Sequence, residues 1–411
     1  MHVTHLSLTN FRNYGRLELP IPTGPILLHG HNAQGKTNLL EAIYYLATTR
    51  SPHTTQDSEL INWSASQSQE PVIVGRLVAQ VTTAAGERHL EMRLIQEQQG
   101  TVNGQSSFRR EALVNRRKVR LMDLLGNLRV VMFLPEDMGL ITGSPANRRR
   151  YIDITLCQID PIYCQTLSQY NKVLEQRNAL LRRLAEGLGG RDVLPIYDEK
   201  LVNLGSQLFA RRTRFFSELA REAQRIHYEV LTGGRESIRV NYLPRLRGDL
   251  SNRQGDSEAL TRLYDWLQQH QEDMAKITAD YAQALAAARP TELARGSTTV
   301  GPHRDDWVVE VNGRDLSSFG SRGQQRSALL ALKMAEIQWM ANRTGETPIL
   351  LLDEVVAELD EQRRELLLHY VEQATQALLT ATDPAMFTND FLQQATMLQV
   401  KNGRVLTGVN S

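Results

Sequence analysis

The pattern of apolar and polar residues changes twice along the chain. Up to about residue 110 it predicts mainly β-strands, because apolar residues gather in short runs or alternate with polar ones. The clearest of these strands are expected at residues 25–28, 71–81 and 89–96, and a further buried strand at 130–134. An Asn103-Gly104 pair predicts a tight hairpin turn.

The middle of the chain has the period of amphipathic helices. Apolar residues recur at steps of four and three from Tyr163 to Leu184, then from Leu201 to Ile226, and again from about Asp256 to Pro290. Glycines at 187–190, with Pro195, separate the first helix from the second. This pattern predicts a helical bundle or a short antiparallel coiled coil.

Strand and helix patterns alternate again from about Thr298. A strand is expected where Trp307, Val309 and Val311 alternate with polar residues, and a second Asn-Gly turn follows it. A helix is expected over 324–344. An apolar strand is expected over 348–352, followed by a helix that reaches about 376. We therefore expect an α/β fold at both ends of the chain and a mainly helical insertion between them.

Composition narrows the class of protein. The chain has 411 residues, of which 41% are hydrophobic and 23% charged, as in globular proteins of two or three domains. Cys157 and Cys164 are too few for a disulfide framework or a four-cysteine zinc site. The N-terminus lacks the apolar core of a signal peptide, and no apolar run approaches the ~20 residues of a membrane span. We expect a cytoplasmic protein without a membrane partner.

One motif points to nucleotide chemistry. The segment Gly30-His31-Asn32-Ala33-Gln34-Gly35-Lys36-Thr37 has the form G-x-x-x-x-G-K-[ST], and it lies between a predicted strand and a helix that opens with Asn38. Backbone amides of such a loop wrap a phosphate at a helix N-terminus. Lys36 is expected to reach the β- and γ-phosphates of ATP, and the Thr37 hydroxyl to bind Mg²⁺.

An acidic pair supplies the usual partner of this loop. The strand at 349–352 runs into Asp353 and Glu354, where Asp353 would hold Mg²⁺ through water and Glu354 would polarise the attacking water. Lys36 and Asp353 are 317 residues apart (353 − 36). The simplest geometry is one head built from residues 1–140 and 296–411, with residues 141–295 inserted as an arm.

Two further segments resemble motifs of ABC-type ATPases. Residues 319–326 resemble the signature motif, in which Ser321, Gly323 and Gln324 would bind the nucleotide held by a second subunit. Asp360 ends a segment that resembles the loop crossing that dimer. A helix N-terminus is a sound anion site, and a site closed by a second copy implies an ATP-dependent homodimer.

The whole chain resembles the RecF family, which is related to SMC heads. The resemblance rests on residues 8–14, on the phosphate loop, and above all on 134–137 with 143–153, together with 301–306 and 351–360. It implies ATP-dependent DNA binding, dimerisation on ATP, slow hydrolysis, and action with RecO and RecR in loading a recombinase at gaps. No switch histidine follows the expected strand near Ala381, where the family pattern would place a γ-phosphate sensor.

Net charge alone says little about partners, because it is only +1 and averages over the surface. Residues 109–120 contain six basic residues and one acid, Glu111. Residues 351–375 are predominantly acidic. With the family resemblance, we expect sequence-independent contacts to the phosphates of double-stranded, single-stranded or junction DNA. The candidate residues are Arg109, Arg110, Arg116, Arg117, Lys118, Arg120, Arg148 and Arg149.

Three other functions are consistent with parts of this pattern. Another SMC-like DNA clamp ATPase shares these motifs. A transporter nucleotide-binding subunit is disfavoured by the 317-residue spacing and the helical insertion. A helicase would need a second motor domain, for which the sequence has no pattern.

Overall fold

The structure is a computed structural model that describes residues 1–68, 70–97, 107–246 and 257–407. It divides into two compact units, one formed by residues 1–137 with 340–411 and the other by residues 138–339. Residues 296–339 pack within the second unit. The sequence pattern had grouped them with the C-terminal lobe of the head. The expected turn at Asn103-Gly104 lies outside the described residues.

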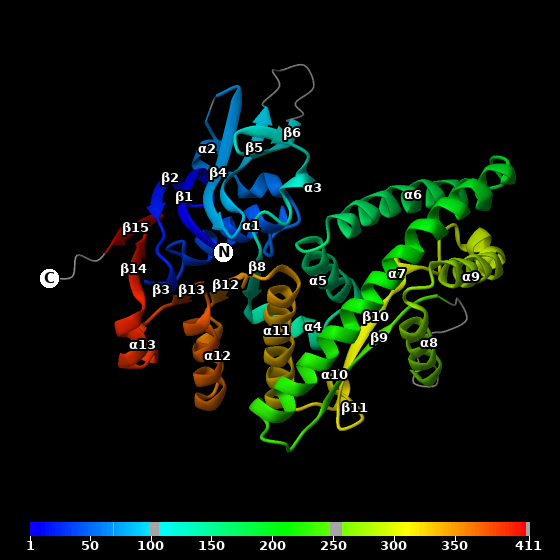
Figure 1. Ribbon diagram of the computed structural model, residues 1–411. Coiled ribbons are helices and arrows are strands. Elements are labelled where there is room, and N and C mark those ends of the chain that lie inside the picture. Colours follow the sequence, from blue (N-terminus) through cyan, green and yellow to red (C-terminus); the bar gives the residue numbers. More distant parts are fainter. Residues whose placement is uncertain (69, 98–106, 247–256, 408–411) are drawn as a thin grey trace. The chain divides into compact units, whose positions relative to one another are not determined.

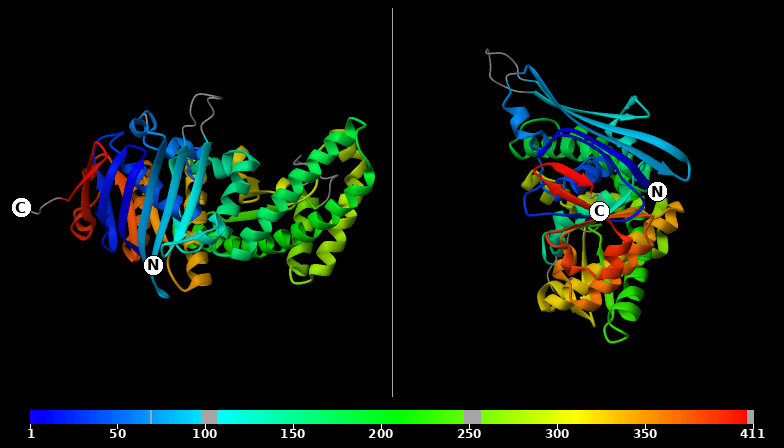
Figure 2. Two further views of the ribbon diagram at one scale, coloured as in Figure 1. Left: turned by 90° about the horizontal axis from the view of Figure 1, so that it is seen from above. Right: turned by 90° about the vertical axis from the view of Figure 1, so that its left-hand side faces the viewer.

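An antiparallel sheet makes up one layer of the first unit, with its strands side by side in Figure 2. Its order is β2-β1-β4-β5-β6-β7. Leu77, Leu90 and Met92 are fully buried on its inner face, whereas charged side chains alternate with them on the outer face. The strands are β1 (His2–Phe11), β2 (Tyr14–Pro20), β4 (Val72–Thr83), β5 (Gly86–Glu97), β6 (Ser107–Val114) and β7 (Arg117–Val119).

The second sheet of this unit joins the two ends of the chain. Its order is β15-β14-β3-β13-β12-β8, parallel except for β15. Strand β3 pairs with β13, so N-terminal and C-terminal residues share one ladder. The strands are β3 (Gly24–His29), β8 (Val130–Phe133), β12 (Ile349–Asp353), β13 (Gln376–Ala381), β14 (Thr396–Lys401) and β15 (Arg404–Thr407).

Helix α1 (Lys36–Thr48) contacts both sheets, which is why ten of its thirteen residues are buried. Helix α12 (Glu361–Gln373) packs on β3 and β13, and it ends before the expected residue 376 because Gln376 already belongs to β13. The shorter helices are α2 (Trp63–Ser66), α3 (Leu121–Leu124) and α13 (Asn389–Gln394). The prediction of a head formed from both chain ends is thereby confirmed.

The second unit is mainly helical, as predicted, and its helices α6 and α7 run side by side in Figures 1 and 2. A three-stranded sheet of order β11-β10-β9 completes it. Helix α11 continues past the unit boundary at residue 340. The elements are α4 (Gly139–Thr142), α5 (Pro145–Cys157), α6 (Pro161–Ala185), α7 (Leu194–Arg225), β9 (Ile238–Leu243), α8 (Ser257–His270), α9 (Met274–Arg295), β10 (Asp306–Val311), β11 (Arg314–Asp315), α10 (Leu316–Phe319) and α11 (Arg322–Thr344).

Two sequence predictions for this unit were wrong. The third helical stretch is two helices, because Asp273 accepts a hydrogen bond from the Lys276 amide and starts α9 anew. That helix also continues through Pro290 to Arg295, where Gly296 caps it with a left-handed φ of 65°. Strand β9 lies between the second and third helical stretches, where the sequence pattern predicted no element.

Among the described residues, none of the helices has both the length and the apolar composition needed to cross a membrane.

Candidate nucleotide site and signature loop

The phosphate loop connects β3 to α1 in the first unit, and its two glycines have conformations that other residues rarely adopt. Gly30 has a φ of 144°, and a Cβ there would lie 2.4 Å from the Val400 carbonyl oxygen. Gly35 has a φ of 116°, and its Cβ would lie 2.6 Å from the Asn13 side chain. Both positions therefore require glycine.

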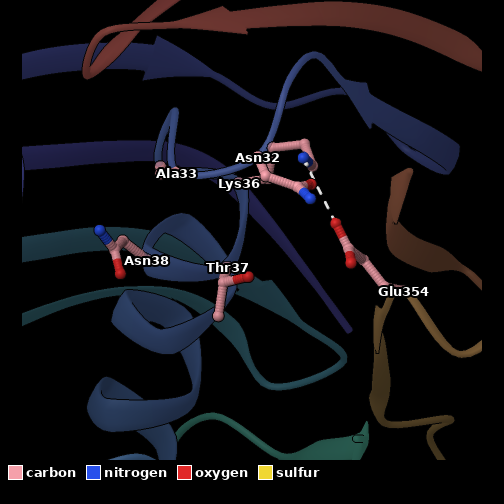
Figure 3. Close-up of a pocket in the computed structure, with 7 residues that line it drawn as sticks. Asn32, Ala33, Lys36, Thr37, Asn38 and Glu354 are labelled. Atoms are coloured by element: carbon pink, nitrogen blue, oxygen red, sulfur yellow. Dashed lines mark ion pairs between the residues drawn. The ribbon is translucent and has the colours of Figure 1, made fainter. Parts of the chain in front are cut away.

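Lys36 folds back over the loop that precedes it. Its ammonium Nζ donates to the carbonyl oxygens of Gly30 at 2.8 Å and His31 at 3.1 Å. The same Nζ lies 3.4 Å from the Glu354 carboxylate, the ion pair drawn in Figure 3. These groups border a cavity of about 230 Å³ that is also lined by Asn32, Ala33, Gly35, Thr37 and Asn38.

Thr37 and Asp353 meet although they are distant in sequence. The Thr37 hydroxyl donates to Asp353 Oδ1 at 2.9 Å. Asp353 is 6% exposed, and burial raises its pKa while hydrogen bonds from Thr380 and Thr37 oppose that effect. A nearby cation would relieve the cost of a buried carboxylate, so this pair of hard oxygen ligands fits Mg²⁺.

The described residues contain no group of three or more His, Cys, Asp or Glu side chains placed to hold a metal ion. Mg²⁺ would therefore rely on nucleotide phosphates and water in addition to Thr37 and Asp353. Those are the two residues that the sequence motifs indicated as metal ligands.

Thr380 is a member of this site that the sequence motifs did not indicate. Its hydroxyl on β13 donates to Asp353 Oδ1 at 2.7 Å and accepts from the Glu354 amide at 2.9 Å. Glu354 itself has a left-handed φ of 53°, an uncommon conformation for this residue type. Thr380 therefore fixes the carboxylate of one acid and the backbone of the next.

A second layer holds the phosphate loop from outside. Asn13 donates to the Gln34 carbonyl at 2.8 Å, and Tyr14 donates to the Gly35 carbonyl at 2.9 Å. From the C-terminal hairpin, the amides of Asn402 and Gly403 donate to the Gln34 side chain and carbonyl at 2.8 and 3.0 Å. The family-like opening segment at residues 8–14 thus supports the loop. The hairpin had no signal in the sequence beyond its Asn-Gly turn.

The proposed signature loop lies in the second unit, where it caps α11. Ser321 Oγ accepts from the Gln324 amide at 3.2 Å, and Gln324 Oε1 accepts from the Ser321 amide at 2.9 Å. This reciprocal pair is a capping box that leaves Gly323 in the first turn of the helix. In the first unit, Asp360 caps α12 by accepting from the Arg363 amide at 3.0 Å.

The basic stretch at residues 109–120 has fewer unpaired cations than its composition indicated, because acids from other segments form ion pairs with several of them. Arg109 pairs with Glu97, and Arg110 lies 2.6 Å from Asp57 and donates to the Thr49 carbonyl. Arg120 pairs with Asp123 at 2.8 Å, and Lys118 with Glu111 at 2.8 Å. The structure describes no acidic partner for the exposed Arg116 and Arg117.

Arg148 and Arg149 are structural in the second unit. The Arg148 guanidinium is 10% exposed and forms two hydrogen bonds to Asp306, at 2.6 and 2.9 Å. Arg149 donates to the Asp305 carbonyl at 2.7 Å, and burial lowers its pKa. Engaged guanidiniums in such positions are poorly placed to reach DNA.

Comparisons with known proteins agree along the whole chain. A family model described as RecF/RecN/SMC N terminal domain matches residues 2–405. A Chloroflexus aurantiacus protein named DNA replication and repair protein RecF is 42% identical over 418 residues, covering 99% of this chain and 100% of the relative. A Bacillus subtilis protein of the same name is 35% identical, covering 99% of this chain and 100% of the relative.

Solved structures agree as well. A structure of the recombination mediator protein RecF with ATP, from the RecFOR pathway, has a TM-score of 0.79 and 30% identity, and the match covers 99% of this chain and 98% of that one. An Smc head bound to a domain of ScpA has a TM-score of 0.50 at 15% identity, over 99% of this chain and 97% of that one, which shows a shared fold. The chain therefore belongs to the RecF family of DNA replication and repair proteins.

Proposed function

We propose that this protein is an ATP-switched DNA clamp of recombinational repair and replication. ATP binding would join two copies over DNA, and slow hydrolysis would reset them to monomers. The observation that carries the proposal is the contact between Thr37 and Asp353, which brings the phosphate loop and the acidic strand end into one site.

Each residue of the site has a role that its position supports. Amides of the loop from Asn32 to Thr37 would bind the phosphates at the N-terminus of α1. On nucleotide binding, Lys36 would exchange its loop carbonyls and Glu354 for the β- and γ-phosphates. Glu354, released from that ion pair, would orient the attacking water. Mg²⁺ bound at Thr37 and Asp353 would neutralise developing phosphate charge.

Dimerisation follows from the signature loop. Ser321, Gly323 and the N-terminus of the 23-residue α11 form an anion site that serves a nucleotide on a second copy. Asp360, at the start of α12, would lie on the same dimer interface. Neither half of such a composite site is complete alone, so ATP bound to one copy would also contact the second copy and hold the dimer together.

DNA contact is proposed for a smaller set of residues than the sequence suggested. Arg116 lies in the exposed β6–β7 turn with a φ of 65°, and the exposed Arg117 begins the edge strand β7. Arg109 on β6 and Lys118 on β7 lie in exposed ion pairs. Such pairs contribute little stability, ~0–1 kcal/mol, so phosphates can replace their acids. Buried or doubly engaged arginines are left out.

The cellular role rests on the relatives. Proteins of this family carry names that place them in DNA replication, repair and the RecFOR pathway. We propose that this chain acts in the same pathway with RecO and RecR, assisting recombinase loading at gaps or junctions in the cytoplasm.

Sedimentation velocity and DNA retention test the proposal together. With ATP the wild-type chain should become dimeric and hold DNA, whereas with ADP or no nucleotide it should not, and strand separation should be absent throughout. Ser321→Arg should bind ATP as a monomer and fail to dimerise. Lys36→Arg should bind ATP with little turnover. A wild-type chain that stays monomeric with ATP, or a dimer unaffected by Ser321→Arg, would contradict the model.

A further inference from the structure

We infer that Glu236 is a positioning residue for the signature loop, a role that rests on the proposed function. Glu236 lies between the end of the long helix α7 and β9, 85 residues before Ser321 in the sequence (321 − 236). Its carboxylate Oε1 accepts a hydrogen bond from the Gln324 side-chain amide Nε2 at 2.7 Å. Gln324 is the same residue that closes the capping box with Ser321.

The chemistry of an amide side chain explains why this contact matters. A glutamine presents a donor on one side and an acceptor on the other, and a half-turn of its terminal group exchanges them. A carboxylate only accepts, so Glu236 requires the Gln324 NH₂ group to face it. The Gln324 oxygen must then face the Ser321 amide, which donates to it at 2.9 Å. Glu236 thus selects the one amide orientation that maintains the capping box.

The backbone of Glu236 is itself held firmly. Its carbonyl oxygen lies 3.2 Å from His227 Nδ1 and 3.1 Å from the Thr232 hydroxyl. Its amide donates to the same Thr232 oxygen at 3.2 Å. His227 belongs to a π-helical turn, Ile226–Leu231, that follows α7, and such turns occur often at functional sites. The Glu236 carboxylate therefore extends from a loop with a fixed backbone, and it can hold the Gln324 side chain in one position.

A second contact holds the other side of the loop. The neighbouring Gln325 side chain donates to the Leu316 carbonyl at 3.1 Å, and the Gly320 amide donates to the same carbonyl at 3.1 Å. Gly320 has no room for a side chain, because a Cβ would lie 2.4 Å from Leu316 Cδ1. The loop is thus fixed before any nucleotide arrives, which favours binding because little ordering is left to occur.

Three substitutions of Glu236 separate its hydrogen-bonding role from a general structural one. Glu236→Ala removes the acceptor and should weaken ATP-dependent dimerisation by roughly 10- to 100-fold, the range expected for loss of one hydrogen bond to a charged group. Glu236→Gln retains an acceptor oxygen and should restore most of the wild-type dimerisation. Glu236→Lys offers only donors, so it should turn the Gln324 amide around and dimerise least well. Glu229→Ala, which removes an exposed acid from the π-helical turn, is the matched control.

Three measurements make the outcome decisive. Dimerisation is followed by sedimentation velocity over a range of protein concentrations with ATP, alongside ATP binding by the monomer, which should be unchanged in all variants. Hydrogen exchange in the nucleotide-free monomer should be faster at the amides of Ser321 and Gln324 in Glu236→Ala, and unchanged in Glu229→Ala. Unaltered exchange at these two amides would overturn the inference, even if dimerisation changed. A wild-type chain that never dimerises would instead refute the proposed function.

Discussion

The hydroxyl of Thr380 lies 2.7 Å from Asp353 Oδ1 in the candidate nucleotide site. This hydrogen bond links the C-terminal ends of the neighbouring strands β13 and β12. Both residues are buried, and the same hydroxyl accepts from the Glu354 amide. Two acids with different proposed roles are thus positioned by one threonine.

Replacing that hydroxyl should slow hydrolysis more than it weakens ATP binding. Thr380→Val preserves the shape of the side chain but removes the acceptor of the Glu354 amide and one of the two hydroxyl donors to Asp353 Oδ1, which keeps its hydrogen bond from Thr37. Loss of a hydrogen bond to a buried group costs about 1–3 kcal/mol. We expect turnover to fall at least tenfold in steady-state phosphate release, with ATP affinity within a few-fold of wild type. Thr380→Ser should retain most activity, and Thr375→Val, at an exposed threonine before the same strand, should have no effect. Equal turnover in Thr380→Val and wild type would exclude the role.

The C-terminal hairpin should influence nucleotide binding through Gly403. This glycine has a φ of 66°, and a Cβ there would lie 2.3 Å from the Asn13 carbonyl oxygen. Gly403→Ala should therefore displace Asn13 or the hairpin, and both contact Gln34 of the phosphate loop. We expect ATP affinity to fall several-fold in equilibrium binding. Gly86→Ala is the matched control, since its φ of 111° imposes similar backbone strain in open space.

Sequence reasoning succeeded where chemistry and strand pattern coincide. The phosphate loop and the Asp353-Glu354 pair each follow an apolar strand, so parallel pairing of β3 and β12 through β13 brings them to one edge. Thr380 was missed because it is one of two polar residues in a buried strand, with no motif nearby in the sequence to indicate a role. Partners of the basic stretch were missed because Asp57 and Glu97 come from other elements of the fold. A count of charges within one segment omits such partners.

Charge reversal at the β6–β7 hairpin should reduce DNA binding without affecting ATP binding. Arg116→Glu with Arg117→Glu removes two exposed cations that have no acidic partner in the described part of the chain. DNA affinity should fall, and the slope of log affinity against log salt should become shallower by about 0.9 for each duplex phosphate that the variant no longer neutralises. Arg120→Glu serves as the control because Asp123 already engages that guanidinium through two hydrogen bonds. An unchanged salt slope in the double variant would show that DNA binds at another surface of the protein.

The family-like segment at residues 301–306 predicts a pH dependence of stability in the second unit. His303 accepts at Nδ1 from Tyr170 at 2.7 Å and donates from Nε2 to the Thr298 carbonyl at 3.2 Å. Burial lowers the pKa of His303 to about 3, from about 6.5 in an unfolded chain. Between these values the unfolded chain binds more protons, so stability should fall as pH decreases below about 6.5.

The comparison of wild type with His303→Gln isolates this effect. Burial also raises the pKa of Asp305 to about 6, and that group acts with the opposite sign, because its stabilising contribution is lost as pH rises through this value. Both chains contain Asp305, so the difference between their thermal midpoints reports His303 alone. The variant should be less stable at pH 7.5, since glutamine does not reproduce both hydrogen bonds. Its deficit should shrink as pH falls to 5.5, because only the wild type must keep a neutral histidine there. A deficit that stays constant over this range would show that His303 does not carry the pH dependence.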